Sequence, residues 1–356
     1  MTVTAFFESV ISLSFQVTFL ILITASLARY IRNERTGDGL WQACHAFVLL
    51  LTIATFAVPH LRLFPHFLVL SGGSREAALA FETRFGLGLL WLCFAGMTIG
   101  LGALILSTGQ IRRILRAACP IEFESLFKRC PEIQKELPDG RTIRWMRSEV
   151  AAGPFCWQIH QPMIVLPTFV LDFNDDELQA VITHETTHLT ARHPLYLFLQ
   201  RVVELLFWFH PVIWWASWQA AASREFVCDR SAARSSKAAS ACLRSLLRLA
   251  DRGVTVTGGL PAGLPFGAGA SLTQKRAARL AEFDIPRLVG TIDRFVVLLL
   301  LAAAVAAFSL QLPLDVMASD RSIWSPWPTW SARALQAVGV SARDYEIDSH
   351  RAEEHH

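Results

Sequence analysis

Residues 184–188 read His-Glu-Thr-Thr-His, and this pentapeptide decides both the expected chemistry and the expected local fold. In a helix, His184 and His188 lie at i and i+4 on one face, about one turn apart. Two neutral imidazoles so placed can bind one Zn²⁺, while Glu185 can take a proton from a zinc-bound water. The pattern predicts one zinc ion per chain, with His184 and His188 as ligands and Glu185 as the catalytic base. The alternative is a helix that carries two partly buried histidines.

The residues around this pentapeptide indicate that it lies within a helix. The acidic stretch 172–180 offers Asp172, Asn174 and Asp175 as N-caps before a run of apolar residues at helical spacing. Upstream, residues 142–146, 155–160 and 163–166 are predicted to form short strands, separated by Gly-Pro and Pro. A strand edge beside a zinc cleft can bind an extended peptide, and a simple structural hairpin is the alternative.

A catalytic zinc site needs a third protein ligand and an open position for water. Residues 223–233 read SREFVCDRSAA and are predicted to be helical, which places Glu225 and Asp229 at i and i+4. We predict that Glu225 is the third ligand and that Asp229 orients a ligand histidine through its free ring N–H. The alternative is a solvent-exposed helix face whose charged residues form ordinary surface ion pairs.

The other histidines and the cysteines are weaker candidates for this site. His193 is too close to His188 for the metzincin ligand spacing and is predicted to be a helix-end residue. His210 is predicted to be structural, and so is His160, although it could line the cleft. Cys228 lies between Glu225 and Asp229 in sequence, but its side chain need not face the metal. The seven cysteines include no CxxC pair and indicate no disulfide framework.

The composition predicts a membrane protein, with 53% hydrophobic residues, 18% charged residues and a mean hydropathy of +0.37. Apolar runs predict transmembrane helices at about 8–28, 41–60, 86–108 and 291–312, each near the roughly 20 residues that cross a bilayer. The first run follows no basic segment and precedes no convincing cleavage site, so we predict a span and not a signal peptide.

Basic residues predict the orientation of these spans, because Lys and Arg favour the cytoplasmic side. They cluster after the first span, after the third and before the fourth. The clusters are Arg29, Arg32 and Arg35; Arg112, Arg113, Arg116, Lys128 and Arg129; and Lys275, Arg276, Arg279, Arg287 and Arg294. We therefore predict an outer N-terminus, with the region between the third and fourth spans inside.

The expected fold class is mainly α and integral to the membrane, with an inserted α+β zincin-like protease domain. The predicted parts are a three-span region at 1–111, an inner zinc metalloprotease domain at 112–290, a fourth span at 291–312 and an outer tail at 313–356. The apolar segment 195–218 cannot cross the membrane once, since His188 and Glu225 would then lie on opposite sides. We predict a helical hairpin, divided at Pro211, that dips into the inner leaflet or packs on the spans.

The order of these features resembles the membrane gluzincin proteases of the bacterial β-lactam sensor-transducer (BlaR/MecR) type. The resemblance rests on IVLP at 164–167, HETTH at 184–188, FWFHP at 207–211, REFVCD at 224–229 and the fourth apolar run. It implies the same zinc ligands and base, support from Asp229, and a multi-pass protein of the bacterial cytoplasmic (inner) membrane with a cytoplasmic protease domain. It also implies cleavage either of the protein itself or of a repressor.

The sequence departs from this resemblance in two respects. His193 and His210 stand where the resemblance leads us to expect Asp and Asn. Residues 313–356 are too few for a penicillin-binding sensor domain, so β-lactam sensing is not expected.

Two alternatives to a signalling protease stay open at this point. One is a housekeeping membrane protease of the HtpX/CAAX-processing type, and the other is a non-catalytic signal transducer with a structural zinc site. The expected partners are the lipid bilayer and a peptide or protein substrate such as a transcriptional repressor. Direct binding of nucleic acid is not expected, because the inner loops account for the net charge of +3.

Overall fold

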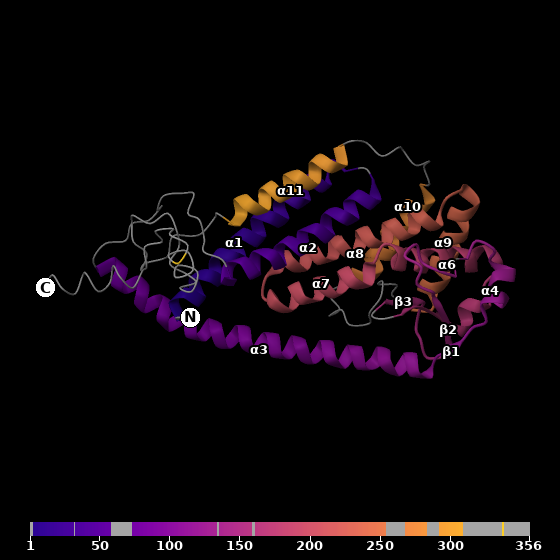
Figure 1. Cartoon of the computed structure of the whole chain (residues 1–356), viewed down its shortest axis with the longest axis horizontal. Coiled ribbons are helices and arrows are strands. Elements are labelled where there is room, and N and C mark those ends of the chain that lie inside the picture. The colour runs from indigo at the N-terminus through magenta and orange to yellow at the C-terminus, as the bar shows by residue number, and fades with distance from the viewer. Residues whose placement is uncertain are drawn as a thin grey trace.

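The computed structural model describes residues 3–31, 33–57, 73–133, 135–158, 161–253, 268–282 and 292–308, together with residue 337. These residues form a bundle of long helices joined end to end with an α+β domain (Figure 1). The predicted fold class, mainly α with an α+β insertion, agrees with this arrangement. The predicted tail at 313–356 lies outside the described residues except for residue 337, and so do Arg32, His160 and Arg287.

Within the described part of the chain, four helices build the bundle: α1 (Val3–Ala28), α2 (Glu34–Ala57), α3 (Gly73–Ala117) and α11 (Ile292–Phe308). Among the described residues, three segments are long and apolar enough to cross a membrane, at Phe6–Ala28, Glu34–Thr55 and Ala80–Ala117. They correspond to the first three predicted spans. Helix α11 has 17 residues and contains a shorter apolar stretch at Leu298–Ala307, so the fourth span stays a prediction.

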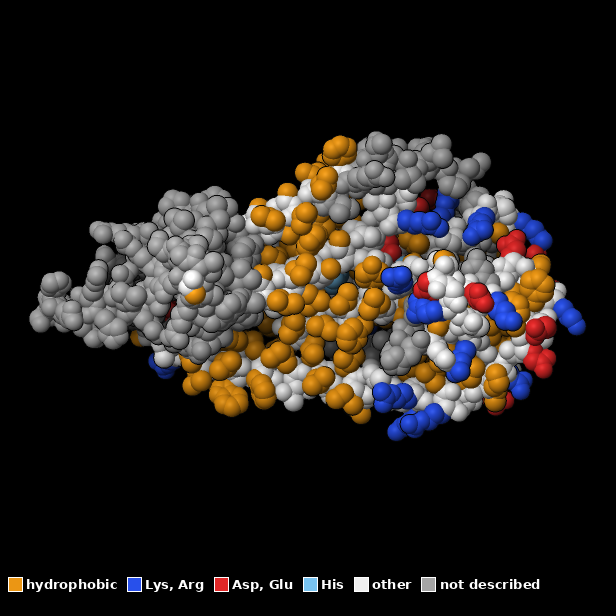
Figure 2. All heavy atoms as spheres, viewed as in Figure 1, with side chains coloured by type: hydrophobic (Ala, Val, Ile, Leu, Met, Phe, Trp, Pro, Cys, Tyr) orange, Lys and Arg blue, Asp and Glu red, His pale blue; other side chains and the backbone are white. Residues whose placement is uncertain are grey.

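The outer surface of the bundle is apolar, as a lipid-facing surface should be. Figure 2 shows hydrophobic side chains over the middle of the molecule, whereas Lys, Arg, Asp and Glu gather over the α+β end. In the span of α3, only 6% of the most apolar window is buried. A monomer in water rarely exposes an apolar surface of this extent, which supports insertion of the bundle in a bilayer.

Helix α3 is longer than its predicted span at 86–108. Its 45 residues extend over about 68 Å, more than twice the roughly 30 Å of a hydrocarbon core. The C-terminal end of α3 therefore continues beyond the membrane to the α+β domain, where it carries Arg112, Arg113 and Arg116.

The α+β domain contains a small sheet and seven helices within the described residues. Its strands are β1 (Cys119–Pro120), β2 (Arg144–Ser148), β3 (Phe155–Gln158) and β4 (Pro162–Pro167). Its helices are α4 (Phe123–Arg129), α5 (Thr168–Leu171), α6 (Asp175–Thr190), α7 (His193–Leu206), α8 (Pro211–Ala232), α9 (Ser236–Asp251) and α10 (Ala268–Ala281). The sheet order is β1-β2-β4-β3, in which β4 is parallel to β2 and antiparallel to β3. The three predicted strands are confirmed as β2, β3 and β4, with bounds shifted by a few residues.

A hydrophobic core between the sheet and α6 fixes the position of that helix. Ile164 and Leu166 of β4 are fully buried, and they belong to one apolar cluster with Leu178 and Ile182 of α6. Burial of each such side chain contributes on the order of 1.5–3 kcal/mol. The other face of α6 is thereby directed toward α8, against which it packs.

The apolar segment 195–218 forms a helical hairpin, as predicted. Helix α7 ends at Leu206 and α8 begins at Pro211, which lacks the N–H that would continue α7. At the turn, Nε2 of His210 lies 3.2 Å from the Ser14 carbonyl oxygen and 3.2 Å from the Thr18 hydroxyl, both near the middle of α1. The hairpin therefore packs on the spans, and its helices α7 and α8 lie side by side (Figure 1). His188 and Glu225 remain on the same side of the bundle, since 3.6 Å separates Nε2 of His188 from Oε1 of Glu225.

Candidate zinc site

Helix α6 begins where the sequence predicts and presents its polar residues to α8. The side chain of Asn174 caps the helix by accepting a hydrogen bond from the Glu177 N–H at 2.9 Å. Acidic residues in the first turn are favourable at the positive end of the helix dipole. His184, Glu185 and His188 are all buried, so the pentapeptide faces the interior of the protein.

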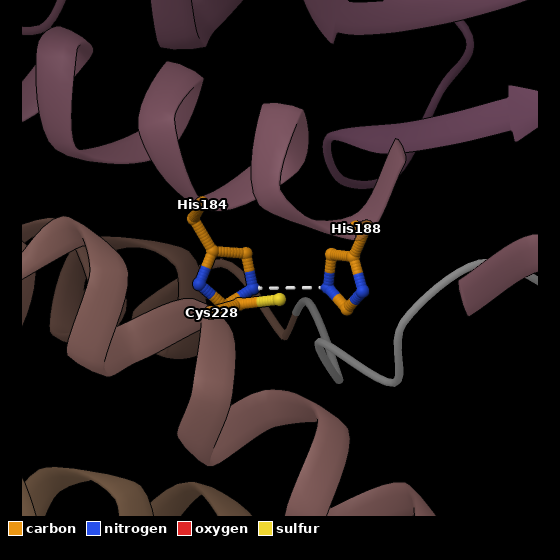
Figure 3. Close-up of side chains that lie close together, drawn as sticks. All are labelled: His184, His188 and Cys228. Carbon is orange, nitrogen blue, oxygen red and sulfur yellow. Dashed lines mark hydrogen bonds between the residues drawn. The ribbon is translucent and has the colours of Figure 1, made fainter. Parts of the chain in front are cut away.

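Three candidate ligand groups converge between α6 and α8. The Nε2 atoms of His184 and His188 lie 3.2 Å apart (Figure 3). The Glu225 carboxylate places Oε2 3.3 Å from Nε2 of His184 and Oε1 3.6 Å from Nε2 of His188. With bonds of about 2.0–2.1 Å, two N or O ligands of a tetrahedral zinc ion lie about 3.3 Å apart. The observed spacing therefore fits one zinc ion held by His184, His188 and Glu225.

A carboxylate supports His184 from the side opposite to this centre. Nδ1 of His184 lies 3.1 Å from Oδ1 of Asp229, to which a protonated Nδ1 donates. This hydrogen bond leaves the lone pair of Nε2 available to a metal. Asp229 thus lies where the sequence predicts a supporting carboxylate.

Arg276 of α10 links the two carboxylates of α8. Its Nε and Nη2 donate to Asp229 at 2.8 and 2.7 Å, and its Nη1 lies 2.8 Å from Oε2 of Glu225. The sequence suggested Arg276 only as one of the basic residues that mark the inner side. That interpretation was incomplete, because the side chain is buried and compensates two buried negative charges.

Cys228 also faces this centre, which the sequence left open. One ligand atom from each of His184, His188 and Cys228 lies within 4.8 Å of the others (Figure 3). Cys228 is three residues after Glu225 on α8, and the two therefore share a helix face. The structure thus offers two candidate third ligands, and the Glu225 oxygens have the spacing that fits zinc better.

His193 was predicted to be a helix-end residue without a role in the site, and this prediction needs correction. It does begin α7, but its ring is buried against His188, with 2.8 Å between their Nδ1 atoms. On its other side, Nε2 of His193 lies 2.9 Å from Oδ2 of Asp38 in α2. His193 therefore connects the helix of the pentapeptide with the bundle.

Burial and neighbouring charges shift the pKa values of the ionisable residues in this cluster. Burial raises the pKa of Glu185 to about 7, and the neighbouring Glu225 charge adds to the rise. Burial alone would lower the pKa of His184, but hydrogen bonds to Asp229 and Glu225 raise it to about 9. Burial would raise the pKa of Glu225, but Arg276 and the two histidines hold it well below its usual range. The anionic carboxylates thus favour a cation at the centre of the cluster.

A small cavity borders Glu185 and His184. Its other walls are mainly apolar and come from α6, α9 and the segment before β3. The lining includes Pro154, Val181, Ser245, Leu246, Leu249 and Arg276. Glu185 therefore faces a space in which a reacting group could lie beside the candidate ligands.

The structure brings together all the residues that the sequence singled out for the zinc site. His184, Glu185, His188, Glu225 and Asp229 form one buried cluster. The alternative of a solvent-exposed face on α8 is wrong, because Glu225 and Asp229 are only 2% and 4% exposed. His210 lies in the hairpin turn and does not contact the cluster.

Neither the role of Asp38 nor the burial of Arg276 was predicted from the sequence. Asp38 lies near the polar start of α2, which also carries Glu34 and Arg35. It still falls within Glu34–Thr55, a segment apolar enough to cross a membrane, and an ionisable residue in a span is itself a signal of function. No local pattern indicates its partner, since 155 residues separate Asp38 from His193.

Comparison with known proteins identifies the family of this region. Residues 76–250 match the family described as BlaR1 peptidase M56. Regulatory protein BlaR1 of Bacillus licheniformis is 27% identical over 143 residues, which are 38% of this chain and 23% of the relative. The methicillin resistance mecR1 proteins of Staphylococcus aureus and Staphylococcus epidermidis are 31% identical over 80 residues, which are 22% of this chain and 14% of each relative. The chain thus matches less than a quarter of the length of these relatives. Residues 76–250 belong to the M56 peptidase family of the BlaR1 and MecR1 sensor-transducer type.

Proposed function

We propose that this chain is an integral-membrane zinc endopeptidase that acts in signalling by cleaving itself or a regulatory protein such as a repressor. The observation that carries the proposal is the spacing of the His184, His188 and Glu225 ligand atoms, at 3.2–3.6 Å from one another. The M56 family match supports peptidase chemistry, and the BlaR1 and mecR1 relatives favour signalling over housekeeping proteolysis.

In the proposed mechanism, His184, His188 and Glu225 hold one zinc ion, and Asp229 keeps His184 in the tautomer that binds metal. Zinc, when bound, supplies a Lewis acid toward water and the scissile carbonyl. Glu185 accepts the proton of the attacking water and delivers it to the nitrogen of the leaving amine. Because Glu185 is not a ligand in this scheme, its removal should leave metal binding intact.

The edge of the sheet suggests how a peptide substrate binds. Among the described residues, β3 pairs with β4 on one side only, and it contacts α6 beside the cluster. An extended peptide can add to such an edge through main-chain hydrogen bonds. We propose that β3 aligns the substrate across Glu185, in a domain on the cytoplasmic side of the membrane.

The test compares wild type with Glu185→Gln, each purified as the full chain in detergent and loaded with zinc. Cleavage of the chain itself and of a fluorescence-quenched peptide library is measured by mass spectrometry and fluorescence. We expect Glu185→Gln to cleave at least about 100-fold more slowly than wild type while it retains zinc, because the general base is gone.

The matched control is Asp176→Asn, which neutralises an exposed acid on the same helix and should leave the cleavage rate unchanged. Cleavage that survives in zinc-loaded Glu185→Gln would refute the mechanism. If neither the zinc-loaded wild type nor the variant cleaves anything, the non-catalytic transducer is favoured instead.

A further inference from the structure

The ring nitrogen of His188 that faces away from the candidate zinc centre is the start of a buried chain of hydrogen bonds. Nδ1 of His188 lies 2.8 Å from Nδ1 of His193, whose Nε2 lies 2.9 Å from Oδ2 of Asp38. The three side chains are 3–5% exposed. The chain of contacts runs from α6 through the first residue of α7 to α2, the second helix of the bundle.

An ionised Asp38 and a neutral His193 together set the direction of both hydrogen bonds in this chain. An ionised carboxylate only accepts, so Nε2 of His193 must donate to it. A neutral His193 then accepts at Nδ1, and Nδ1 of His188 must donate. The remaining nitrogen of His188, Nε2, keeps its lone pair and lies 3.2 Å from Nε2 of His184, at the candidate zinc centre.

The backbone between α6 and α7 brings His193 into this position. Arg192 adopts φ 56° and ψ 28°, the left-handed conformation, and it is the only such non-glycine residue among those described. This conformation costs a non-glycine residue about 1–2 kcal/mol. The sharp turn at Arg192 lets α7 begin at His193, next to His188. The strained backbone of Arg192 thereby brings the two imidazole rings into contact.

The carboxylate of Asp38 is itself held in place by its surroundings. Nε2 of Gln42, one turn later on α2, donates to Oδ2 of Asp38 at 2.6 Å. Helix α2 packs against both α7 and α8, so its position relative to the cluster is fixed by two contacts. The two candidate histidine ligands are thus supported differently: His184 directly by Asp229 of the domain, and His188 indirectly by Asp38 of the bundle.

We propose that Asp38 is a positioning residue for the zinc ligand His188, and that it acts through His193. A membrane helix would then supply part of the support of the metal site in the domain. The inference rests on the proposed function only in requiring that His188 binds zinc.

The test measures metal binding instead of cleavage. Full-length wild type, Asp38→Ala, Asp38→Asn and the double variant Asp38→Ala/His193→Asp are purified in detergent. Zinc affinity is measured by competition with a chelator, and the visible spectrum is recorded after loading with Co²⁺. His45→Gln is the matched control, because His45 is also buried on α2 and contacts α8 at Ser217 without joining the chain of contacts to His188.

We expect Asp38→Ala to weaken zinc binding by about 10–100-fold and to change the Co²⁺ spectrum, as loss of a supporting partner does. Asp38→Asn should lose less, since its amide oxygen can still accept a hydrogen bond. The double variant should return close to wild-type affinity, because a carboxylate at position 193 accepts directly from His188. His45→Gln should bind zinc as wild type does.

Wild-type affinity in Asp38→Ala, or a loss that His193→Asp does not restore, would overturn the proposal. If Asp38→Ala does not fold, Asp38→Asn with and without His193→Asp answers the same question. Failure of the folded wild type to bind zinc would refute the proposed function itself. This outcome is distinct from a failure of the Asp38 proposal, in which wild type binds zinc but Asp38→Ala shows no loss.

Discussion

The bundle and the α+β domain distribute polar and apolar side chains in opposite ways. On α3 of the bundle, Trp91 and Ile99 are 65% and 74% exposed, whereas the polar Gln16 and His45 of the bundle are buried inside. In the domain, apolar side chains such as Ile164, Leu166 and Leu178 form a buried core, and charged side chains gather on the surface (Figure 2). The difference follows from the surroundings that each half requires, lipid for the first and water for the second.

The candidate zinc site differs from the rest of the domain, where charged side chains lie on the surface. It lies where the bundle and the domain meet. Its charged residues are buried, and helix α8 begins among the residues of the bundle core and ends among those of the domain. The candidate ligands thus come from domain helices, while the residues that support them come from both halves.

The largest expected effect comes from removing the positive charge that compensates the buried carboxylates. Arg276→Met keeps the length of the side chain but leaves Glu225 and Asp229 without their common partner. We expect the free energy of unfolding of the metal-free chain to fall by about 3–5 kcal/mol. Denaturant titration in detergent, followed by helical circular dichroism, measures this change.

Arg279→Met is the control for that variant. Arg279 is on the same helix but is exposed and stacks over Phe226 at 3.8 Å. Its loss should cost about 1 kcal/mol or less. If the two variants lose the same free energy of unfolding, the buried Arg276 stabilises the chain no more than an exposed arginine does, which would contradict its role in compensating the buried carboxylates.

The next effect tests the exposed apolar surface of the bundle. Ile99→Asp places a charge near the middle of the predicted third span, which should disfavour membrane insertion of α3 by about 2.5–3.5 kcal/mol. Glycosylation sites engineered on either side of α3 report the inserted fraction. Gln110→Asp, at an exposed position nearer the domain, should change it little. If Ile99→Asp inserts as well as wild type, this surface of α3 does not face lipid, and the proposed contrast between a lipid-facing bundle and a water-facing domain is contradicted.

The smallest effect tests how the α7–α8 hairpin is joined to the bundle. A Cβ added at Gly96 would overlap the indole ring of Trp208 in the hairpin turn, whereas one at Gly102 would meet no atom within 4 Å. We expect Gly96→Ala to lower the free energy of unfolding in detergent by about 1–3 kcal/mol. Gly102→Ala should cause no loss. Indistinguishable stabilities would contradict the close packing of the hairpin on α3.

Much of the fold and site follows from short-range patterns. The i, i+4 spacing predicts which residues of α6 and α8 share a face, and Asn174 is recognisable as a cap. Pro211, together with the need to keep His188 and Glu225 on one side, predicts the hairpin. The extension of α3 beyond 86–108 was missed, because an apolar run indicates only the part of a helix that lies in lipid.

The contacts that hold the candidate ligands in place could not be predicted from short-range patterns. Arg276 contacts Asp229 across 47 residues, and His193 contacts Asp38 across 155, so no local pattern connects them. Cys228 is different, since its position three residues after Glu225 already places it on the ligand face of α8. The orientation of the spans, the crossing by α11 and the domain boundaries stay predictions.

The zinc content of the full chain purified in detergent, with Glu225→Ala and Cys228→Ser beside wild type, tests the proposed site most directly. We expect about one zinc per chain in wild type and in Cys228→Ser, and its loss in Glu225→Ala. No zinc in a folded wild type would contradict the zinc site altogether. Loss of zinc in Cys228→Ser with retention in Glu225→Ala would contradict the assignment of Glu225 as the third ligand.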